Sequence, residues 1–215
     1  MAVTQVNPTR MELSRLKKKL NTATRGHKLL KDKRDELMRQ FLELIKENRA
    51  LRIRVEAAIK SANAGFVLAK ASMSDQTQKA ALLAPKQEIM VDISHKNVMS
   101  VDIPQFSYTT RTPNADDIYS YGFAFTSADL DDAVKSLSDI LPDLIKLAEI
   151  EKSCQLMASE IEKTRRRVNA LEHVMIPQTQ EQIRYITRKL DENERSTQTR
   201  LMKVKDMMLK DAHGY

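Results

Sequence analysis

The chain has 215 residues, with 36 Lys and Arg against 29 Asp and Glu, a formal net charge of +7, four Gly and no Trp. Charged residues make up 30% and aromatic residues 5% of the chain, which is typical of solvated helix surfaces and excludes a large globular core. Apolar runs are too short for a membrane span, and the first residues lack the apolar stretch of a signal peptide. The single cysteine excludes an internal disulfide. We therefore expect a basic, mainly helical, cytoplasmic protein.

Residues 13 to 69 carry mostly apolar side chains at alternating spacings of three and four. A seam of this length predicts a helix that lies along another helix in a left-handed supercoil. Thr9 and Glu12 have capping-box spacing just after Pro8, so we predict a helix at about 9 to 74, roughly 100 Å long. The seam positions are Leu13, Leu16, Leu20, Ala23, His27, Leu30, Arg34, Leu37, Phe41, Leu44, Asn48, Leu51, Val55, Ala58, Ala62, Gly65 and Ala69.

The pattern changes from about 76 to 126, where prolines and glycine return and apolar residues alternate with polar ones. Alternation over this length predicts a β-hairpin or a small sheet with an irregular return. The first run ends at Ser94-His95-Lys96-Asn97, and the second is broken at Pro104. The alternating residues are Ile89, Val91, Ile93, Val101, Ile103, Phe106 and Tyr108, and the proline and glycine positions are Pro85, Pro104, Pro113 and Gly122.

A second seam begins near Ser127, where three aspartates suit the positive end of a helix dipole. It predicts a helix from 127 to about 210 with a kink at Pro177. Two successive steps of four around that proline form a stutter, which locally unwinds a supercoil. The positions are Leu130, Val134, Leu137, Leu141, Leu144, Leu147, Ile150, Cys154, Met157, Ile161, Thr164, Val168, Leu171, Met175, Thr179, Ile183, Ile186, Leu190, Asn193, Thr197, Arg200, Val204 and Met207.

Two long seams joined by a short middle segment should fold back as an antiparallel pair. The predicted fold class is mainly α: a long antiparallel two-helix coiled coil with a small head, containing a β-hairpin, at the turn. The predicted segments are an N-terminal shaft helix at 1–75, the head at 76–126 and a C-terminal shaft helix at 127–215. Residues near 70 would lie beside those near 135, and residues near 15 beside those near 200.

The seam should be held mainly by large apolar side chains, and Arg34 and Asn48 are among the polar residues that interrupt it. Arg34 and Asn48 favour a role in fixing the register, and the alternative is a docking port for a further protein chain. The small residues from Ala58 to Ala69 would allow close helix approach near the head. The ten residues that we expect to carry the seam are Leu16, Leu20, Leu37, Leu44, Leu51, Ile161, Val168, Ile183, Leu190 and Val204.

No group of residues predicts catalysis or metal binding. The four histidines are scattered, whereas a zinc site needs several convergent ligands. His27 and Cys154 both lie on a seam, where packing is the simpler interpretation. The string Thr24-Arg25-Gly26-His27-Lys28 lacks the spacing of a phosphate loop. We expect no catalytic residues, no metal and no cofactor, so the chain should not be an enzyme.

Basic residues are concentrated near the N-terminus, with ten Lys or Arg and two acids between Arg10 and Arg34. They cover several faces of the predicted helix and are not balanced by acids at i+4. Such a surface could engage nucleic-acid phosphates, acidic lipids or an acidic protein cavity, and the alternative is a solvated helix face. The absence of interleaved aromatics and of a known nucleic-acid motif disfavours nucleic acid.

Several long strings identify a family. They are Asn7-Pro8-Thr9-Arg10-Met11-Glu12-Leu13, the stretch from Ala23 to Leu37, Glu162 to Glu172 followed by Ile176-Pro177, Leu190 to Arg195, and Arg200 to Lys205. These strings closely resemble the D subunits of the rotary V-type ATPases. The resemblance covers both predicted helices and is weakest in the head. The chain ends soon after the matched region, which resembles the bacterial or archaeal form more than the longer eukaryotic one.

The resemblance implies a non-catalytic central rotor shaft, located in the cytoplasm and peripheral to the membrane. Its partners would be the hexameric ring of A and B subunits, the F subunit on the side of the shaft, and the adapter on the membrane rotor ring, without nucleic acid. Torque would pass between the catalytic ring and the ion-translocating ring. The alternatives are a basic coiled coil on nucleic acid and a passive scaffold. The residues that we expect to contact the catalytic ring are Arg10, Arg15, Lys17, Lys18, Lys19 and Arg25.

Overall fold

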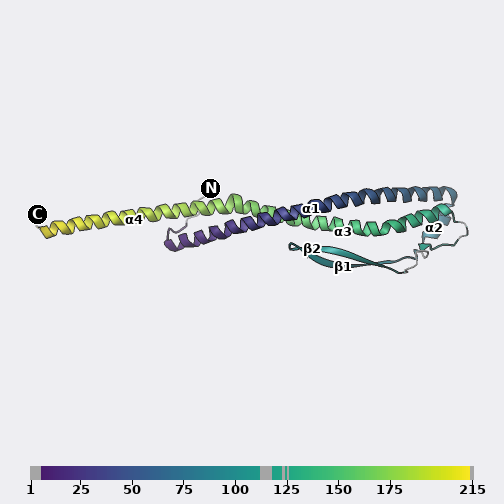
Figure 1. Cartoon of the computed structure of the whole chain (residues 1–215), viewed down its shortest axis with the longest axis horizontal. Coiled ribbons are helices and arrows are strands. Elements are labelled where there is room, and N and C mark those ends of the chain that lie inside the picture. The colour runs from purple at the N-terminus through teal and green to yellow at the C-terminus, as the bar shows by residue number, and fades with distance from the viewer. Residues whose placement is uncertain (1–5, 112–117, 123, 125, 214–215) are drawn as a thin grey trace. The chain divides into compact units, whose positions relative to one another are not determined.

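The computed structural model describes residues 6–111, 118–122, 124 and 126–213. Pro113, which belongs to the predicted head, lies outside the described residues. The chain separates into two compact units, the first with residues 1–35 and 162–215 and the second with residues 36–161. The elements in chain order are α1 Arg10–Ser72, α2 Asp75–Leu82, β1 Ile89–Val98, β2 Val101–Thr110, α3 Ala128–Ala170, η2 Leu171–Met175 and α4 Ile176–His213 (Figure 1).

Helix α1 confirms the predicted helix at 9–74, because it runs from Arg10 to Ser72. The backbone N–H of Glu12 donates to Thr9 Oγ1 at 3.2 Å, so Thr9 caps the start of the helix. At Gly65 a Cβ would lie 3.1 Å from the Cβ of Ala133. The missing side chain therefore lets α1 and α3 approach closely, as the run of small residues predicts.

The second unit is built on α1 and α3, which pair in an antiparallel manner. One apolar cluster is formed by Val55 and Ala62 of α1 with Ile140 of α3. A neighbouring cluster contains Ala69 of α1 and Leu130 of α3, together with Ala81 of the short helix α2. The predicted fold class is confirmed. Helix α2 was not predicted, although Ser74, whose side chain accepts the N–H of Thr77, is a recognisable N-cap.

Strands β1 and β2 form the predicted hairpin, with Val98 paired to Val101 across the turn. Residues 94–97, which follow the alternating run in the sequence, continue β1 and pair with β2. The chain reverses at Met99 and Ser100, which have φ of 51° and 70°. Two positive φ values match a two-residue type I′ turn, for which Gly is the usual second residue.

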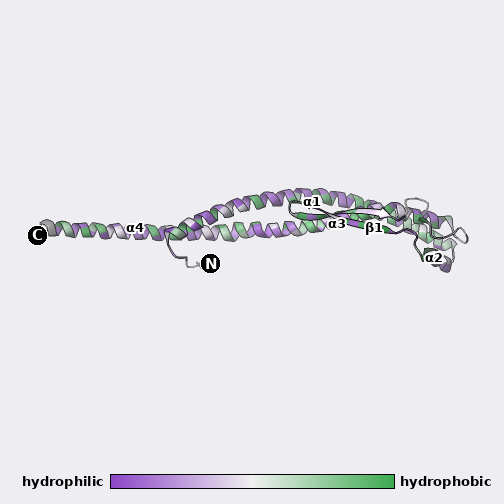
Figure 2. Ribbon diagram, turned by 90° about the horizontal axis from the view of Figure 1, so that it is seen from below, coloured by the Kyte–Doolittle hydropathy of each residue, from purple (hydrophilic) through white to green (hydrophobic). Residues whose placement is uncertain are grey.

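The hairpin runs back beside α3 in both ribbon views (Figures 1 and 2). Its turn end carries Val101, which is buried in a cluster with Leu37 of α1 and Met157 and Ile161 of α3. Nearer its base, the N–H of Phe106 donates to a carboxylate oxygen of Glu149 at 3.4 Å. The hairpin is therefore held along the side of the helix pair.

The first unit pairs the start of α1 with α4 and the end of α3. Leu16, Val168 and Ile186 are buried in this unit, Arg10 forms an ion pair with Glu194, and His27 lies 3.3 Å from Glu172. Because paired antiparallel helices advance at the same rise, residue 15 lies about level with residue 188. The prediction that residues near 15 lie beside those near 200 is therefore wrong by about three helical turns. The physical reason is that α3, η2 and α4 together are longer than α1, so α4 continues past its start.

The C-terminal helical run is continuous through Pro142, which lies inside α3, and changes to a π-helix over Leu171–Met175. The predicted irregularity at Pro177 is therefore a π-helical segment that ends just before the proline. Within this segment the seam moves from Leu171 to Ile176, and the predicted seam residue Met175 is exposed. One π turn spans about five residues and absorbs the stutter.

Candidate interaction surfaces

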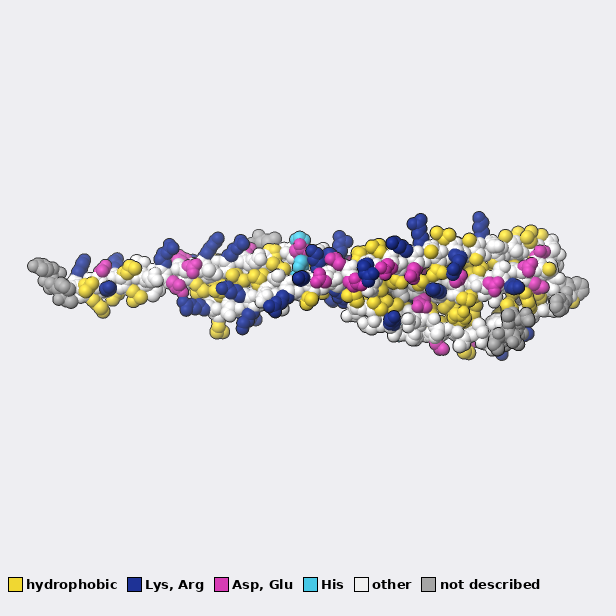
Figure 3. Space-filling view, viewed as in Figure 1, with side chains coloured by type: hydrophobic (Ala, Val, Ile, Leu, Met, Phe, Trp, Pro, Cys, Tyr) yellow, Lys and Arg dark blue, Asp and Glu magenta, His cyan; other side chains and the backbone are white. Residues whose placement is uncertain are grey.

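The basic surface of the first unit consists of the six predicted ring-contact residues on α1. All six are exposed, and Arg10 and Arg15 reach Glu194 and Glu12, the second pair at 3.7 Å. Lys17, Lys18 and Lys19 are consecutive, so they point about 100° apart around the helix. Figure 3 shows Lys and Arg side chains projecting from both edges of this part of the molecule. These residues therefore spread over the part of α1 that faces away from its seam, instead of forming one narrow stripe.

The C-terminal overhang, residues 195–210 of α4, is exposed along its whole length. It includes Val204, which was predicted on the seam and is 48% exposed, so the paired seam ends before it. Methionine side chains are flexible and adapt to varied surfaces. A helix with this many unburied apolar residues offers a contact surface to another protein. Its large apolar residues are Leu201, Met202, Val204, Met207, Met208 and Leu209.

The other predicted seam residues lie between the paired helices to different degrees. Four are buried: Leu16, Leu37, Ile161 and Val168. Five are half-buried: Leu20, Leu44, Leu51, Ile183 and Leu190. The half-buried residues show that the pair of helices leaves part of its apolar stripe open to solvent.

A side groove of about 310 Å³ lies between α1 and α3 in the second unit. Asn48, interpreted from the sequence as a register residue or a port, lines it together with Cys154. Burial, with the nearby Glu151 carboxylate, raises the pKa of the Cys154 thiol, which leaves it unsuited to nucleophilic chemistry. Glu149 contacts the hairpin, whereas Glu151 lines the groove. Residues two apart in a helix point in directions about 200° apart around its axis. The groove and the hairpin therefore lie on opposite sides of α3.

Exposed apolar side chains of α1 form a stripe, of which Ile45 lines this groove, and sequence analysis missed them. They are spaced by four, three and eight residues, which is a second helical stripe beside the seam. That spacing could have been read from the sequence, but a stripe next to a strong seam is easily assigned to the seam. The residues are Met38, Leu42, Ile45 and Ile53.

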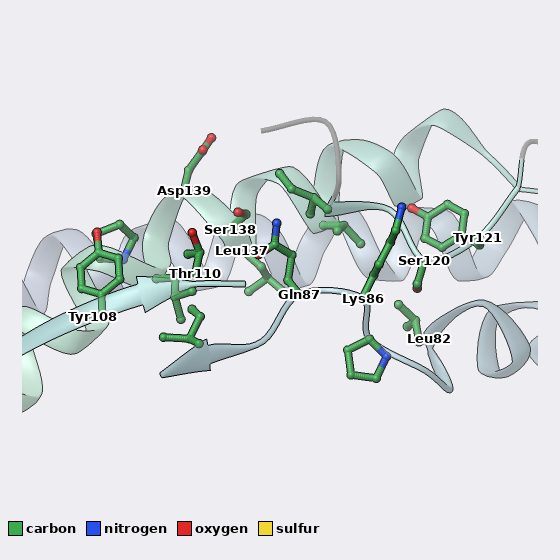
Figure 4. Close-up of a pocket in the computed structure, with 16 residues that line it drawn as sticks. Leu82, Lys86, Gln87, Tyr108, Thr110, Ser120, Tyr121, Leu137, Ser138 and Asp139 are labelled. Carbon is green, nitrogen blue, oxygen red and sulfur yellow. The ribbon is translucent and has the colours of Figure 1, made fainter. Parts of the chain in front are cut away.

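A larger cavity of about 500 Å³ lies in the second unit between the base of the hairpin, α2 and α3. Figure 4 shows Tyr108 and Thr110 on the hairpin side and Leu137, Ser138 and Asp139 on α3. Most of the remaining lining is aliphatic: Leu82, Pro85, Ile89, Val134, Leu141 and Pro142. No sequence pattern pointed to this cavity, because it depends on how the hairpin folds back over α3.

Tyr121 is held at one end of this cavity by a hydrogen bond from its hydroxyl to Asp131 Oδ1 at 2.7 Å. Burial, followed by the hydrogen bond and charge of Asp131, raises the pKa of the Tyr121 phenol. The tyrosine therefore stays neutral and forms a fixed wall of the cavity.

Among the described residues, no helix is both long enough and apolar enough to cross a membrane.

Comparison with known proteins gives a consistent result. The chain matches the ATP synthase D-subunit family over residues 12–206. A V-type ATP synthase D subunit of Acetivibrio thermocellus is 59% identical over 100% of this chain and 97% of the relative. A protein of the same name from Clostridioides difficile is 59% identical over 99% of this chain and 95% of the relative, and one from a Thermoanaerobacter species is 53% identical over 98% and 100%. The chain belongs to the ATP synthase D-subunit family.

Proposed function

We propose that this chain is the central rotor shaft of a rotary V-type ATP synthase and that it carries no catalytic residues of its own. It acts in the cytoplasm, peripheral to the membrane, and passes torque between a ring of A and B subunits and the membrane ion-translocating ring. The observation that carries the proposal is a helix pair that ends in an exposed single helix with six large apolar side chains, beside a basic surface. A shaft inserted into a ring needs such an end.

The shaft acts through differences in binding energy. A rotor can bias a catalytic site only if its contacts have different interaction free energies with the different nucleotide states of that site. The basic surface supplies contacts that depend on angle, because its six residues lie on α1 and therefore on one side of the helix pair. As each site changes its nucleotide, the preferred angle of the shaft changes.

The two surfaces of the first unit have different roles in this proposal. The C-terminal overhang lies deepest in the ring, where its flexible Met and Leu side chains can keep contact while the shaft turns. The basic surface lies behind it and contacts acidic groups of the A and B subunits. Charge contacts of this kind give specificity and orientation more than raw affinity.

The two hollows of the second unit are assigned to other proteins of the complex. We assign the side groove and the stripe of exposed apolar residues on α1 to the F subunit, because exposed helix stripes of this kind accept an apolar face of a partner. We assign the cavity at the base of the hairpin to the adapter on the membrane rotor ring, since its aliphatic lining can take apolar side chains of a partner.

Reconstitution with the A/B ring tests the proposal. We expect the wild-type chain to change the ATPase rate of the ring and to rotate within it, whereas replacement of all six residues of the basic surface by Gln weakens the coupling of hydrolysis to rotation. A matched control replaces six exposed lysines of the second unit, which should retain coupling: Lys60, Lys70, Lys79, Lys96, Lys135 and Lys146. Unchanged torque and turnover in the first variant would contradict the role of the basic surface.

The same preparation distinguishes the other assignments. Ile45→Lys should abolish binding of the F subunit, whereas Leu29→Lys, at an exposed apolar residue of the first unit, should not. A passive scaffold would bind the ring without altering its ATP turnover. A nucleic-acid-binding protein would bind DNA or RNA with an affinity that falls steeply with salt. Either of those two results, without rotation in the ring, would overturn the shaft proposal.

A further inference from the structure

The residues of the C-terminal helical run that face α1 follow a spacing of three and four, and at η2 the run contains one residue more than this spacing allows. The residues facing α1 on either side are the buried Val168 and Thr179, and between them only Leu171 and Ile176 are half-buried. A step of five from Leu171 to Ile176 exceeds the 3.6 residues of an α-helical turn. Val174, at 60% exposed, faces solvent, so the extra residue is carried on the outside of the helix.

The backbone at η2 departs from α-helical hydrogen bonding. The N–H of Ile176 donates to the carbonyl of Leu171, which is a π-type bond across five residues. Pro177 has no N–H to donate and its ring excludes the carbonyl four residues earlier. After the proline, Thr179 Oγ1 donates to the carbonyl of Met175 at 2.7 Å, a side-chain bond that does not replace the one lost at Pro177.

Few apolar contacts stabilise this region. Among the described residues, none of the five in η2 is buried. A polar contact crosses the pair at this level, between His27 and Glu172 at 3.3 Å. Two turns before η2, the Thr164 hydroxyl is buried without a hydrogen-bond partner, which is costly in a protein interior. Segments with few buried apolar contacts and poorly bonded backbone open locally at low free energy.

We propose that η2 is a torsional joint in this chain. Under torque the segment takes up and releases twist by exchanging π-type and α-type hydrogen bonds, while Val168 and Thr179 stay packed on either side. Pro177 keeps the extra residue from moving further along α4, because the proline has no N–H to donate in either a π-type or an α-type hydrogen bond. That torque acts on η2 rests on the proposed shaft function. The local opening of η2 is a property of the chain alone.

Hydrogen exchange on the full chain tests the opening. Deletion of Val174 combined with Pro177→Ala removes the extra residue and restores an N–H donor, and it keeps Thr179 and Ile186 facing α1. We expect the amides of residues 172, 173, 175, 176 and 178 to exchange on the order of tenfold more slowly in this variant than in the wild type. Val174→Ala, which keeps the residue count, should leave exchange unchanged. Pro177→Ala alone should give a smaller slowing, and it guards against a deletion that fails to fold.

The proposal is overturned if wild-type amides of η2 are already as protected as those around Val168 and Ile186. A second measurement follows the angle of a bead attached to the shaft in a stalled A/B complex. The deletion variant should narrow the angular distribution, and Val174→Ala should not; equal widths would overturn the joint. A wild-type chain that does not rotate would contradict the shaft function instead, and the exchange measurement would still decide the joint.

Discussion

The two units are built from the same kind of helix pair but are stabilised differently. The second unit has three apolar clusters, to which α2 and the hairpin contribute. In the described part of the first unit, burial is confined to separate residues, and two of these, Thr164 and Thr179, are polar. The comparison shows that a continuous seam in sequence does not produce uniform packing. Added layers bury more of the apolar surface of the second unit, while the first keeps a bare pair that ends in an exposed helix.

The largest expected effect is a loss of stability when a buried side chain is shortened, and it can be compared at two residues of equal burial. Leu37 of the second unit and Ile186 of the first are both 0% exposed, but only Leu37 lies in an apolar cluster. Large-to-small core substitutions cost about 2–5 kcal/mol, depending on how far the site relaxes. We expect Leu37→Ala to fall near the top of that range and Ile186→Ala near the bottom, measured by urea unfolding. Equal losses would show that the two units are packed alike.

The two interior glycines of α1 give the next effect. Gly65→Leu should destabilise the chain by about 1–3 kcal/mol, because a side chain there is forced against Ala133 and overpacks the helix contact. Gly26 of the first unit has nothing within 4 Å of an added Cβ. Gly26→Ala should therefore stabilise the chain by up to about 1 kcal/mol through helix propensity. Thermal unfolding followed by circular dichroism measures both, and a loss of stability for Gly26→Ala would mean that the first unit has no free space at this position.

The sequence patterns predicted the helices well because heptad spacing depends on local geometry that a long helix repeats many times. The bounds of α1 and the continuity from α3 to α4 follow from that periodicity. The pattern could not distinguish Met175 from Ile176 at the seam. Both are apolar, and the choice depends on Pro177 and the π-type bonding that precedes it.

The sequence did not locate the turn of the hairpin, and it mispredicted the end of the helix pair, in both cases for physical reasons. Met99 and Ser100 carry no turn signal, since residues other than Gly and Asn rarely adopt positive φ. The polar run before them, with Asn97 among its residues, resembles a turn more closely. Val204 continues the heptad spacing, but periodicity does not say whether a partner helix is present at that level. The side groove and the hairpin cavity depend on tertiary placement alone.

The turn of the β1–β2 hairpin offers a test with a smaller expected effect. It concerns the layer that covers the helix pair of the second unit and is missing from the described part of the first. Ser100 has φ of 70°, and its N–H donates to Asn97 Oδ1 at 3.1 Å. Ser100→Gly keeps that bond and removes the penalty for left-handed backbone, which is roughly 1 kcal/mol. We expect slower hydrogen exchange in β1 and β2 and no change in the first unit. Faster exchange in the strands would mean that the serine side chain stabilises the turn.

The smallest expected effect concerns an exposed ion pair at the start of the second unit. Arg39 donates hydrogen bonds to both carboxylate oxygens of Glu36 at 3.0 and 2.6 Å. These bonds, with one from Gln40, lower the pKa of Glu36 from 4.5 to about 2. A carboxyl with a lowered folded-state pKa contributes stability that is present above the unfolded pKa and is lost as pH falls through the folded value. The contribution should therefore disappear between about pH 4.5 and 2.

The size of that contribution should be close to the detection limit, because exposed ion pairs are screened by water and salt. Arg39→Ala should return the Glu36 pKa toward its ordinary value in a carboxyl NMR titration, with little change in the unfolding midpoint at neutral pH. Arg52→Ala, which removes the exposed Arg52–Glu56 pair, is a matched control and should leave the Glu36 titration unchanged. A large drop in stability for Arg39→Ala alone would show that surface charge, and not the apolar clusters, holds this end of the second unit together.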